Sequence, residues 1–309
     1  MMSHYCYQII FSGGWFGDVA PAPPIEVFQL TRDYQADTHP KKVSLGVGAY
    51  RTNEGKPWIL PCVKTAERIL AEKTEKEEIN HEYLPVLGLD SFATAATNML
   101  LGEDSVAVKE NRSIGVQALS GTGALRIGAE FLNRITGLNN AYYSDPTWGN
   151  HGLIFKNAGF KNVTKYRYYD SKTNSLDIEG MLADLESFPP RSVIILHACA
   201  HNPTGVDATK EQWAKIAEVC KSRNLFVFFD CAYQGFASGS LDTDAWAVRY
   251  FVEQGFEIFC SQSFSKNFGL YNERAGNLTV VVKDKSVMTN FQAQITLIVR
   301  YRLPHPMRA

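Results

Sequence analysis

Residues 193–230, VIILHACAHNPTGVDATKEQWAKIAEVCKSRNLFVFFD, contain the pattern that decides the fold. An apolar run opens this stretch, a helical pattern follows at 213–220, and a second apolar run closes it at 225–229. Thr209 and Gln212 precede the helical pattern with the spacing of a capping box. A strand, a helix and a second strand in this order predict two parallel strands joined by a crossover helix.

The same alternation continues through the chain from residue 114 onward. Further apolar runs, rich in Val, Ile, Phe and Tyr, lie at 114–119, 141–144, 163–168, 256–260 and 278–282. Helical periodicity is present at 124–135 and at 178–185. The runs are apolar on both faces, as expected for strands covered by helices on both sides. We therefore expect an α/β fold with a mostly parallel central sheet sandwiched by helices.

The composition excludes several classes of protein. The chain has 309 residues, with 31 Lys and Arg against 32 Asp and Glu, so its formal net charge is −1. The absence of a cationic field argues against nucleic acid or an anionic membrane as the main partner. No apolar run approaches the ~18 residues of a membrane helix, and no secretory or organelle leader is recognisable. The six cysteines form no CxxC pair, which predicts a reduced protein of the cytoplasm.

Polar residues follow the expected strands at their carboxyl ends, where ligands bind in parallel sheets. Asp230 ends one run, and Lys266 follows another in a Ser-rich loop. The turn 120–123, SGTG, leads directly into a helix, and a helix N-terminus suits a phosphate group. A guanidinium at Arg274 could hold the same phosphate bidentately. Lys266 could form a Schiff base with a carbonyl cofactor, and Asp230 could face a protonated pyridine nitrogen.

Each of these residues also has a plainer interpretation. Lys266 could be a solvated loop lysine, and the turn 120–123 could be only a tight connection. Arg274 could form a surface ion pair with Glu273. Asp230 could cap a helix or accept structural hydrogen bonds. The residues alone leave these alternatives open.

Other kinds of site are disfavoured by missing partners. His197, Cys199 and His201 have a period-two spacing that could place three metal ligands on one face of a strand. The remaining ligands of a closed site are not evident, so we predict no metal. No GxSxG elbow or Walker A loop is present, and the GxGxxG pattern of nicotinamide enzymes is only half present, at Gly121 and Gly123.

Longer segments of the chain resemble the aspartate aminotransferases, a family of class I pyridoxal-phosphate enzymes, in the same order. The matching segments are LGVGAYR at 45–51, NHEYLPVL at 80–87, SGTGALR at 120–126, HACAHNPTG at 197–205, FFDCAYQG at 228–235 and SFSKNFGLYNER at 263–274. The resemblance extends from about residue 21 to residue 300, and HACAHNPTG is most similar to the animal cytosolic form.

This resemblance implies the architecture, cofactor and partners of the family. The fold would be the type I fold of pyridoxal-phosphate transferases, in a homodimer with active sites at the subunit interface. The cofactor would be pyridoxal 5′-phosphate. The substrates would be small dicarboxylic amino and oxo acids, with an amino group passing from L-aspartate to 2-oxoglutarate to give oxaloacetate and L-glutamate.

The resemblance also implies roles for individual residues. Lys266 would form the Schiff base and move the proton, Asp230 would pair with the pyridinium nitrogen, and Tyr233 would bind the phenolic oxygen. The further cofactor-binding residues would be Ser120, Gly121, Thr122, Trp148, Asn202, Ser263, Arg274 and, from the second subunit, Tyr83. The substrate-binding residues would be Gly48, Trp148, Asn202 and Arg300. His151 would lie behind Asp230.

The ends of the chain depart from the family pattern. Residues 1–60 would form an N-terminal arm and part of a small domain, and 61–300 the large cofactor-binding domain. Residues 301–309 are divergent, and the family's C-terminal segment, with the arginine for the substrate α-carboxylate, is absent. The small domain would therefore be incomplete. A truncated cofactor-binding isoform without full activity, or a different reaction such as β-decarboxylation or racemisation, stays as an alternative.

Overall fold

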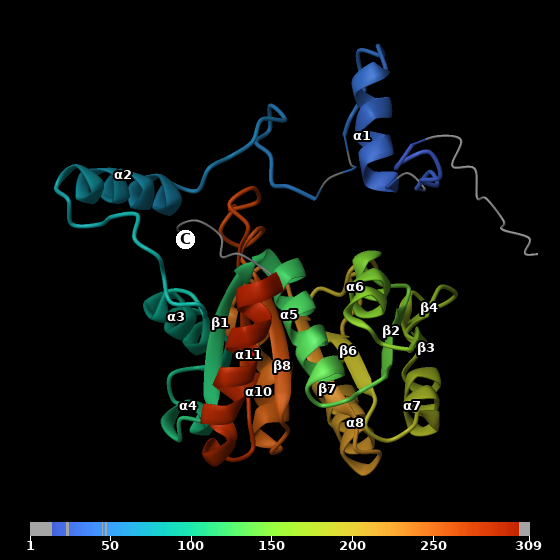
Figure 1. The fold of residues 1–309 in the computed structure, drawn as a ribbon. Coiled ribbons are helices and arrows are strands. Elements are labelled where there is room, and N and C mark those ends of the chain that lie inside the picture. The colour runs from blue at the N-terminus through green and yellow to red at the C-terminus, as the bar shows by residue number, and fades with distance from the viewer. Residues whose placement is uncertain (1–13, 23–24, 45, 47, 303–309) are drawn as a thin grey trace, which may run out of the picture. The chain divides into compact units, whose positions relative to one another are not determined.

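The computed structural model describes residues 14–22, 25–44, 46 and 48–302. The chain divides into two compact units, one ending at Ala49 and the other beginning at Tyr50. The first unit contains helix α1 (Glu26–Ala36). The second unit contains the sheet that the sequence predicts, together with the helices that cover it (Figure 1).

The central sheet has seven strands in the order β1-β9-β8-β7-β6-β2-β3. The strands are β1 (Ser113–Leu119), β2 (Asn140–Asp145), β3 (Asn162–Arg167), β6 (Val193–His197), β7 (Phe226–Cys231), β8 (Ile258–Ser263) and β9 (Ala275–Val281). All neighbouring strands are parallel except that β9 runs antiparallel to both β1 and β8. A separate hairpin joins β4 (Tyr169–Asp170) to β5 (Ser175–Leu176). The expected mostly parallel α/β sheet is confirmed.

Helices cover both faces of this sheet. The helices of this unit are α3 (Asp90–Leu101), α4 (Val106–Lys109), α5 (Ser120–Arg134), α6 (Asn150–Ala158), α7 (Ile178–Ser187), α8 (Lys210–Ser222), α9 (Leu241–Asp244), α10 (Trp246–Glu253) and α11 (Met288–Arg302), with a 3₁₀ turn at Lys285–Val287. A further helix, α2 (Pro61–Glu75), buries none of its residues and does not belong to this covering layer. One core cluster joins the sheet to α3, α7, α8 and α10, and another joins it to α5, α6 and α11. In Figure 1, α5 and α11 lie in front of the sheet. Within the described residues, no helix is long and apolar enough to span a membrane.

Strand β7 shows how the apolar runs form the core. Val227 and Phe229 belong to one core cluster, while Phe228, between them, belongs to the other. Successive side chains of a strand point to opposite faces, so a run that is apolar throughout fits a strand buried on both sides. The predicted capping box is also present, because Thr209 and Gln212 exchange hydrogen bonds of 2.8 and 3.2 Å at the start of α8.

The prediction for 163–168 is wrong in one respect. Strand β3 pairs only with β2, at the edge of the sheet, and most of its side chains are exposed. Tyr166 alone is buried in this strand, and Thr164, Lys165 and Arg167 face solvent. An edge strand packs fewer side chains than a central one, and charges along it prevent pairing with other chains. The expectation of two apolar faces therefore fails here.

Several boundaries differ from the prediction in a way that matters for the site. Asp230 lies inside β7, Ser263 is the last residue of β8, and Ser120 already opens α5. Strand β9 begins at Ala275, immediately after Arg274. These residues gather at the carboxyl ends of the parallel strands. They do so because β9 starts where β8 ends, and Ser263 pairs with Gly276.

Gly276 lies against the backbone of Ser120. A Cβ atom at this position would come within 2.6 Å of the Ser120 backbone, which cannot rotate aside as a side chain can. Gly276→Ala is therefore expected to lower the free energy of unfolding by about 1–3 kcal/mol, measured by urea denaturation. Gly149→Ala is the control, because no atom lies within 4 Å of its Cβ. Equal effects of the two substitutions would contradict the close approach at Gly276.

Candidate active site

Asp230 is the buried carboxylate at the carboxyl edge of the sheet. The residue is 8% exposed. Oδ2 lies 3.0 Å from Nε2 of His151, which is completely buried on α6, and Oδ1 accepts a 3.4 Å hydrogen bond from Ser261 Oγ. His151 thus lies behind Asp230, as the resemblance implies.

The environment of Asp230 keeps its carboxyl ionised. Burial pushes the pKa upward, but the hydrogen bond with His151 and the electrostatic interactions with His151, His197 and Lys266 together outweigh it and hold the pKa of Asp230 below its ordinary value. A buried ionised carboxylate favours a protonated partner at this position.

Lys266 is half-buried in the loop after β8. Its Nζ lies 5.2 Å from the centre of the Tyr233 ring. Burial lowers the pKa of Lys266, Asp230 opposes this change, and the charge of Arg274 adds to it. A lysine with a lowered pKa has a larger fraction of neutral amine, and only the neutral amine is a nucleophile.

Tyr233 and Asn202 bring two polar groups to the same place. Asn202 Nδ2 donates to the hydroxyl oxygen of Tyr233 at 3.5 Å. Burial and then the negative charge of Asp230 raise the pKa of Tyr233, so its hydroxyl keeps its proton at neutral pH. The phenol and the amide can therefore both donate hydrogen bonds to an oxygen atom.

A cluster of hydroxyl groups forms at the start of α5. Ser120 Oγ lies 2.9 Å from Ser263 Oγ and 2.9 Å from Ser265 Oγ, and Arg274 Nη1 donates to Ser265 Oγ at 3.3 Å. A Cβ atom on Gly121 would lie 3.1 Å from that of Ser263, so the helix backbone approaches β8 closely. Hydroxyls, a guanidinium and the free amides of a helix N-terminus together suit a phosphate. The plainer interpretation of Arg274, an ion pair with Glu273, is not observed among the described ion pairs.

The other residues of the expected site make no described side-chain hydrogen bond to these clusters. Thr122 follows Gly121 in the first turn of α5, and Trp148 precedes α6 with its ring 5.4 Å from that of His151. Tyr83 is fully exposed, and Arg300 is exposed on α11. Gly48 belongs to the first unit. Within the described chain, no hydrogen bond or ion pair joins Tyr83 or Arg300 to the groups around Lys266.

Three histidines, His151, His197 and His201, form a polar network that the sequence analysis did not anticipate. Thr147 Oγ1 lies 2.8 Å from His151 Nδ1 and 3.2 Å from His197 Nε2, so it links the two rings. His201 contacts the hydroxyls of Ser144 and Thr204, both at 2.8 Å. The described residues contain no group of three or more ligands placed for a metal. The only signal in the sequence was the period-two spacing of His197, Cys199 and His201, which equally fits metal ligands.

The burial of His197 has a consequence for stability at low pH. Burial lowers the pKa of His197 from 6.5 to about 4, although the charge of Asp230 opposes the change. As the pH falls below 6.5, the unfolded chain takes up a proton that the folded chain does not, and stability is lost until about pH 4. From pH 7 to pH 5 the share of this loss that comes from His197 is expected to be about 2 kcal/mol. The free energy of unfolding, measured with urea at both pH values, checks this prediction. Between these pH values His197→Asn should lose about 2 kcal/mol less than the wild type. An equal loss in both proteins would contradict the prediction.

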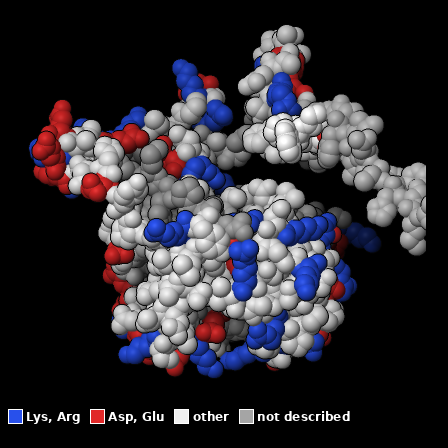
Figure 2. Space-filling model, in the orientation of Figure 1, with Lys and Arg blue, Asp and Glu red and all other residues white. Residues whose placement is uncertain are grey.

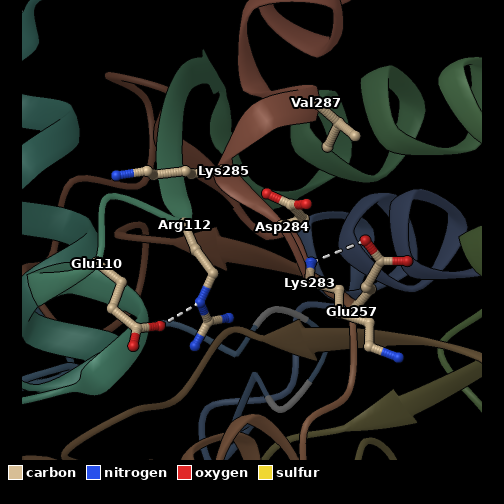
Figure 3. Close-up of a pocket in the computed structure, with 7 residues that line it drawn as sticks. All are labelled: Glu110, Arg112, Glu257, Lys283, Asp284, Lys285 and Val287. Carbon is tan, nitrogen blue, oxygen red and sulfur yellow. Dashed lines mark hydrogen bonds and ion pairs between the residues drawn. The ribbon is translucent and has the colours of Figure 1, made fainter.

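An open hollow of about 740 Å³ lies at the opposite ends of the strands from Lys266 (Figure 3). Its residues precede β1 and β8 or follow β9, and they are Glu110, Arg112, Glu257, Lys283, Asp284, Lys285 and Val287. Arg112 pairs with Glu110 at 2.6 Å, and Glu257 accepts a hydrogen bond from the backbone of Lys283. Basic side chains on the face drawn in Figure 2 are likewise spread over the second unit rather than gathered in one patch. Neither feature competes with the cluster around Lys266 as a catalytic site.

Comparisons with known proteins agree with this geometry. The family model described as aminotransferase class I and II matches residues 40–300. The cytoplasmic aspartate aminotransferase of Caenorhabditis elegans is 56% identical over 94% of this chain and 71% of its own length. The Saccharomyces cerevisiae cytoplasmic aspartate aminotransferase superposes with a TM-score of 0.90 at 41% identity, over 94% of this chain and 72% of that chain. A Burkholderia pseudomallei aromatic-amino-acid aminotransferase, covalently bound to pyridoxal phosphate, gives 0.90 at 41% identity, over 95% and 72%. The chain therefore belongs to the class I and II aminotransferase family.

Proposed function

We propose that this chain catalyses transamination between L-aspartate and 2-oxoglutarate, giving oxaloacetate and L-glutamate, with pyridoxal 5′-phosphate as cofactor. The observation that carries the proposal is the convergence of Lys266, Asp230 and the hydroxyl cluster at one edge of the sheet, in a chain whose relatives are aspartate aminotransferases. The alternative of a cofactor-binding isoform without activity is not favoured by these relatives.

The residues present fit this cofactor. A pyridine ring with a phosphate arm needs an anion partner for its nitrogen, an amine for its carbonyl and a phosphate cradle. Asp230 is buried and ionised, Lys266 has a lowered pKa, and Ser120, Ser263 and Arg274 contribute to one cluster of donors. The close approach of Gly121 to Ser263 brings the helix amides to the same cradle.

The chemistry supplied by the bound cofactor would be an electron sink for the pair left when the substrate Cα loses its proton. Asp230 would hold the proton on the ring nitrogen, which makes that sink effective. Lys266 would bind the carbonyl carbon and, once released by the substrate amine, would take the Cα proton as a nearby base. Tyr233 and Asn202 would orient the ring by hydrogen bonds to its phenolic oxygen.

Further contacts would come from the other residues of the expected site. Trp148 would stack on the ring, Thr122 would add to the phosphate cradle, and Gly48 and Arg300 would bind the carboxylates of the substrate. Tyr83 would bind the phosphate of the partner subunit in a homodimer. Its full exposure supports this, because nothing in the described part of its own chain covers it.

The setting of the proposed enzyme follows its relatives. We infer a cytoplasmic location, since two of them are named cytoplasmic. We also infer that residues 61–300 form the large cofactor-binding domain and that 1–60 supply an arm and part of a small domain; residues 303–309 lie outside the described residues.

A single-turnover experiment tests the function. Protein loaded with pyridoxal phosphate and given L-aspartate alone is expected to release one oxaloacetate per bound cofactor and then stop. Addition of 2-oxoglutarate should then yield glutamate and restore the original absorbance. The stop is expected because the amino group stays on the enzyme until an oxo acid removes it.

Each alternative predicts a different stoichiometry in that experiment. A non-catalytic isoform would show cofactor absorbance but no oxaloacetate. A β-decarboxylase or racemase would continue to form product without any oxo acid. Either outcome would reject the transaminase assignment.

A further inference from the structure

Asp207 holds the loop that carries Asn202. Its Oδ2 accepts a hydrogen bond of 2.6 Å from the backbone N–H of Ala200, and its Oδ1 accepts one of 2.9 Å from that of His201. The two amides are consecutive, and consecutive amides in such a turn form a concave site for an anion. In this chain the anion is the carboxylate of Asp207.

We call these two hydrogen bonds the Asp207 clamp. The loop needs them because its backbone is in an unfavourable conformation. Ala200 has a φ of +47°, a left-handed value that residues with a Cβ rarely adopt. His201 is anchored independently through both ring nitrogens. The position immediately after it is Asn202, whose backbone N–H donates to His197 Nδ1 at 3.2 Å. The backbone that leads into Asn202 is therefore held by the two hydrogen bonds to Asp207.

We propose that Asp207 is a positioning residue that sets the Asn202 amide against Tyr233 and so tunes the proton affinity of the bound cofactor. The tuning of the cofactor rests on the proposed function, whereas the positioning of Asn202 by Asp207 does not. Asp207 is exposed and has no described contact with Lys266, Asp230 or Tyr233. It acts through the loop, not on the reacting atoms.

The physical basis is the donor role of Asn202. A donor to a negatively charged oxygen withdraws electron density and lowers the affinity of the conjugated ring system for a proton. When the clamp is lost, the Asn202 amide is less well held, and its hydrogen bond weakens. The pH midpoint of the visible absorbance of the loaded protein should therefore rise.

The first measurement uses the protein without cofactor. Hydrogen–deuterium exchange of a peptide covering residues 198–205 is compared between wild type, Asp207→Asn and Asp284→Asn. Asp284 also accepts a backbone hydrogen bond, from Ser286 at 2.8 Å, but it lies at the opposite edge of the sheet. Asp207→Asn should accelerate exchange at Ala200 and His201 by about tenfold or more, and Asp284→Asn should not. Unchanged exchange in Asp207→Asn would overturn the clamp, whatever the enzyme's function.

The second measurement is a double-mutant cycle on the protein loaded with pyridoxal phosphate. Asp207→Asn alone should raise the absorbance midpoint by about 0.5 pH unit, and it should add nothing in an Asn202→Ala background. Asp207→Ala, which removes both acceptors where Asp207→Asn keeps one, is the second variant and should give a larger rise. Equal shifts in both backgrounds, or no shift despite faster exchange, would overturn the positioning role. A wild-type protein that binds no pyridoxal phosphate would instead reject the proposed function and leave the exchange result standing.

Discussion

Replacing Lys266 with alanine is expected to lower kcat/KM for aspartate by at least about 10³-fold. Lys266 has two proposed tasks, binding the carbonyl carbon and taking the Cα proton, and alanine can do neither. Steady-state assays of oxaloacetate formation measure the loss, and the absorbance of the cofactor attached to the lysine should disappear as well.

The control for Lys266→Ala is Lys172→Ala. Lys172 is an exposed lysine in the turn between β4 and β5, and only its backbone amide takes part in a described hydrogen bond. Its removal should leave kcat/KM within twofold. Retention of the attached cofactor's absorbance in Lys266→Ala would show that another amine carries the cofactor, and the assignment would fail.

Replacing Asp230 with asparagine is expected to lower kcat by about 10²–10³-fold. Asparagine is nearly the same size and can still bond His151 and Ser261, but it carries no charge to hold a proton on the facing nitrogen. The stability of the variant should change little, so thermal unfolding separates loss of chemistry from loss of fold.

Asp170→Asn is the matched control for Asp230→Asn. Asp170 accepts a backbone hydrogen bond from Lys172 at 2.9 Å on the small hairpin. The same change there should not alter kcat. If Asp230→Asn keeps more than half of the wild-type kcat, the charge of Asp230 is not needed and the proposed pairing is wrong.

Much of the fold could be predicted because strands that are buried on both faces consist of apolar residues. The run ending at Asp230 is apolar throughout and forms a central strand, and the capping box at Thr209 marks the helix start within a residue. Strand β3 was misjudged because its position at the edge is set by the order of the strands, which no local pattern records.

The site could be predicted only in part, for a similar reason. Lys266 and Asp230 each accompany a buried strand, so parallel topology brings them together. Ser265 was missed because its hydroxyl joins the cluster only through the geometry of the loop between β8 and β9. The clamp at Asp207 was missed because its partners are backbone amides, which every residue type shares.

The place of β9 in the sheet has a consequence for how the protein is made. Strand β1 lies at the sheet edge and pairs only with β9, and Ser120 meets Ser263 across 143 residues of chain. At ribosomal rates of about 5–20 residues per second, β1 waits on the order of ten seconds for its partner. An apolar strand without a partner for that time is exposed to aggregation, so we expect folding during synthesis to depend on chaperones that shield it.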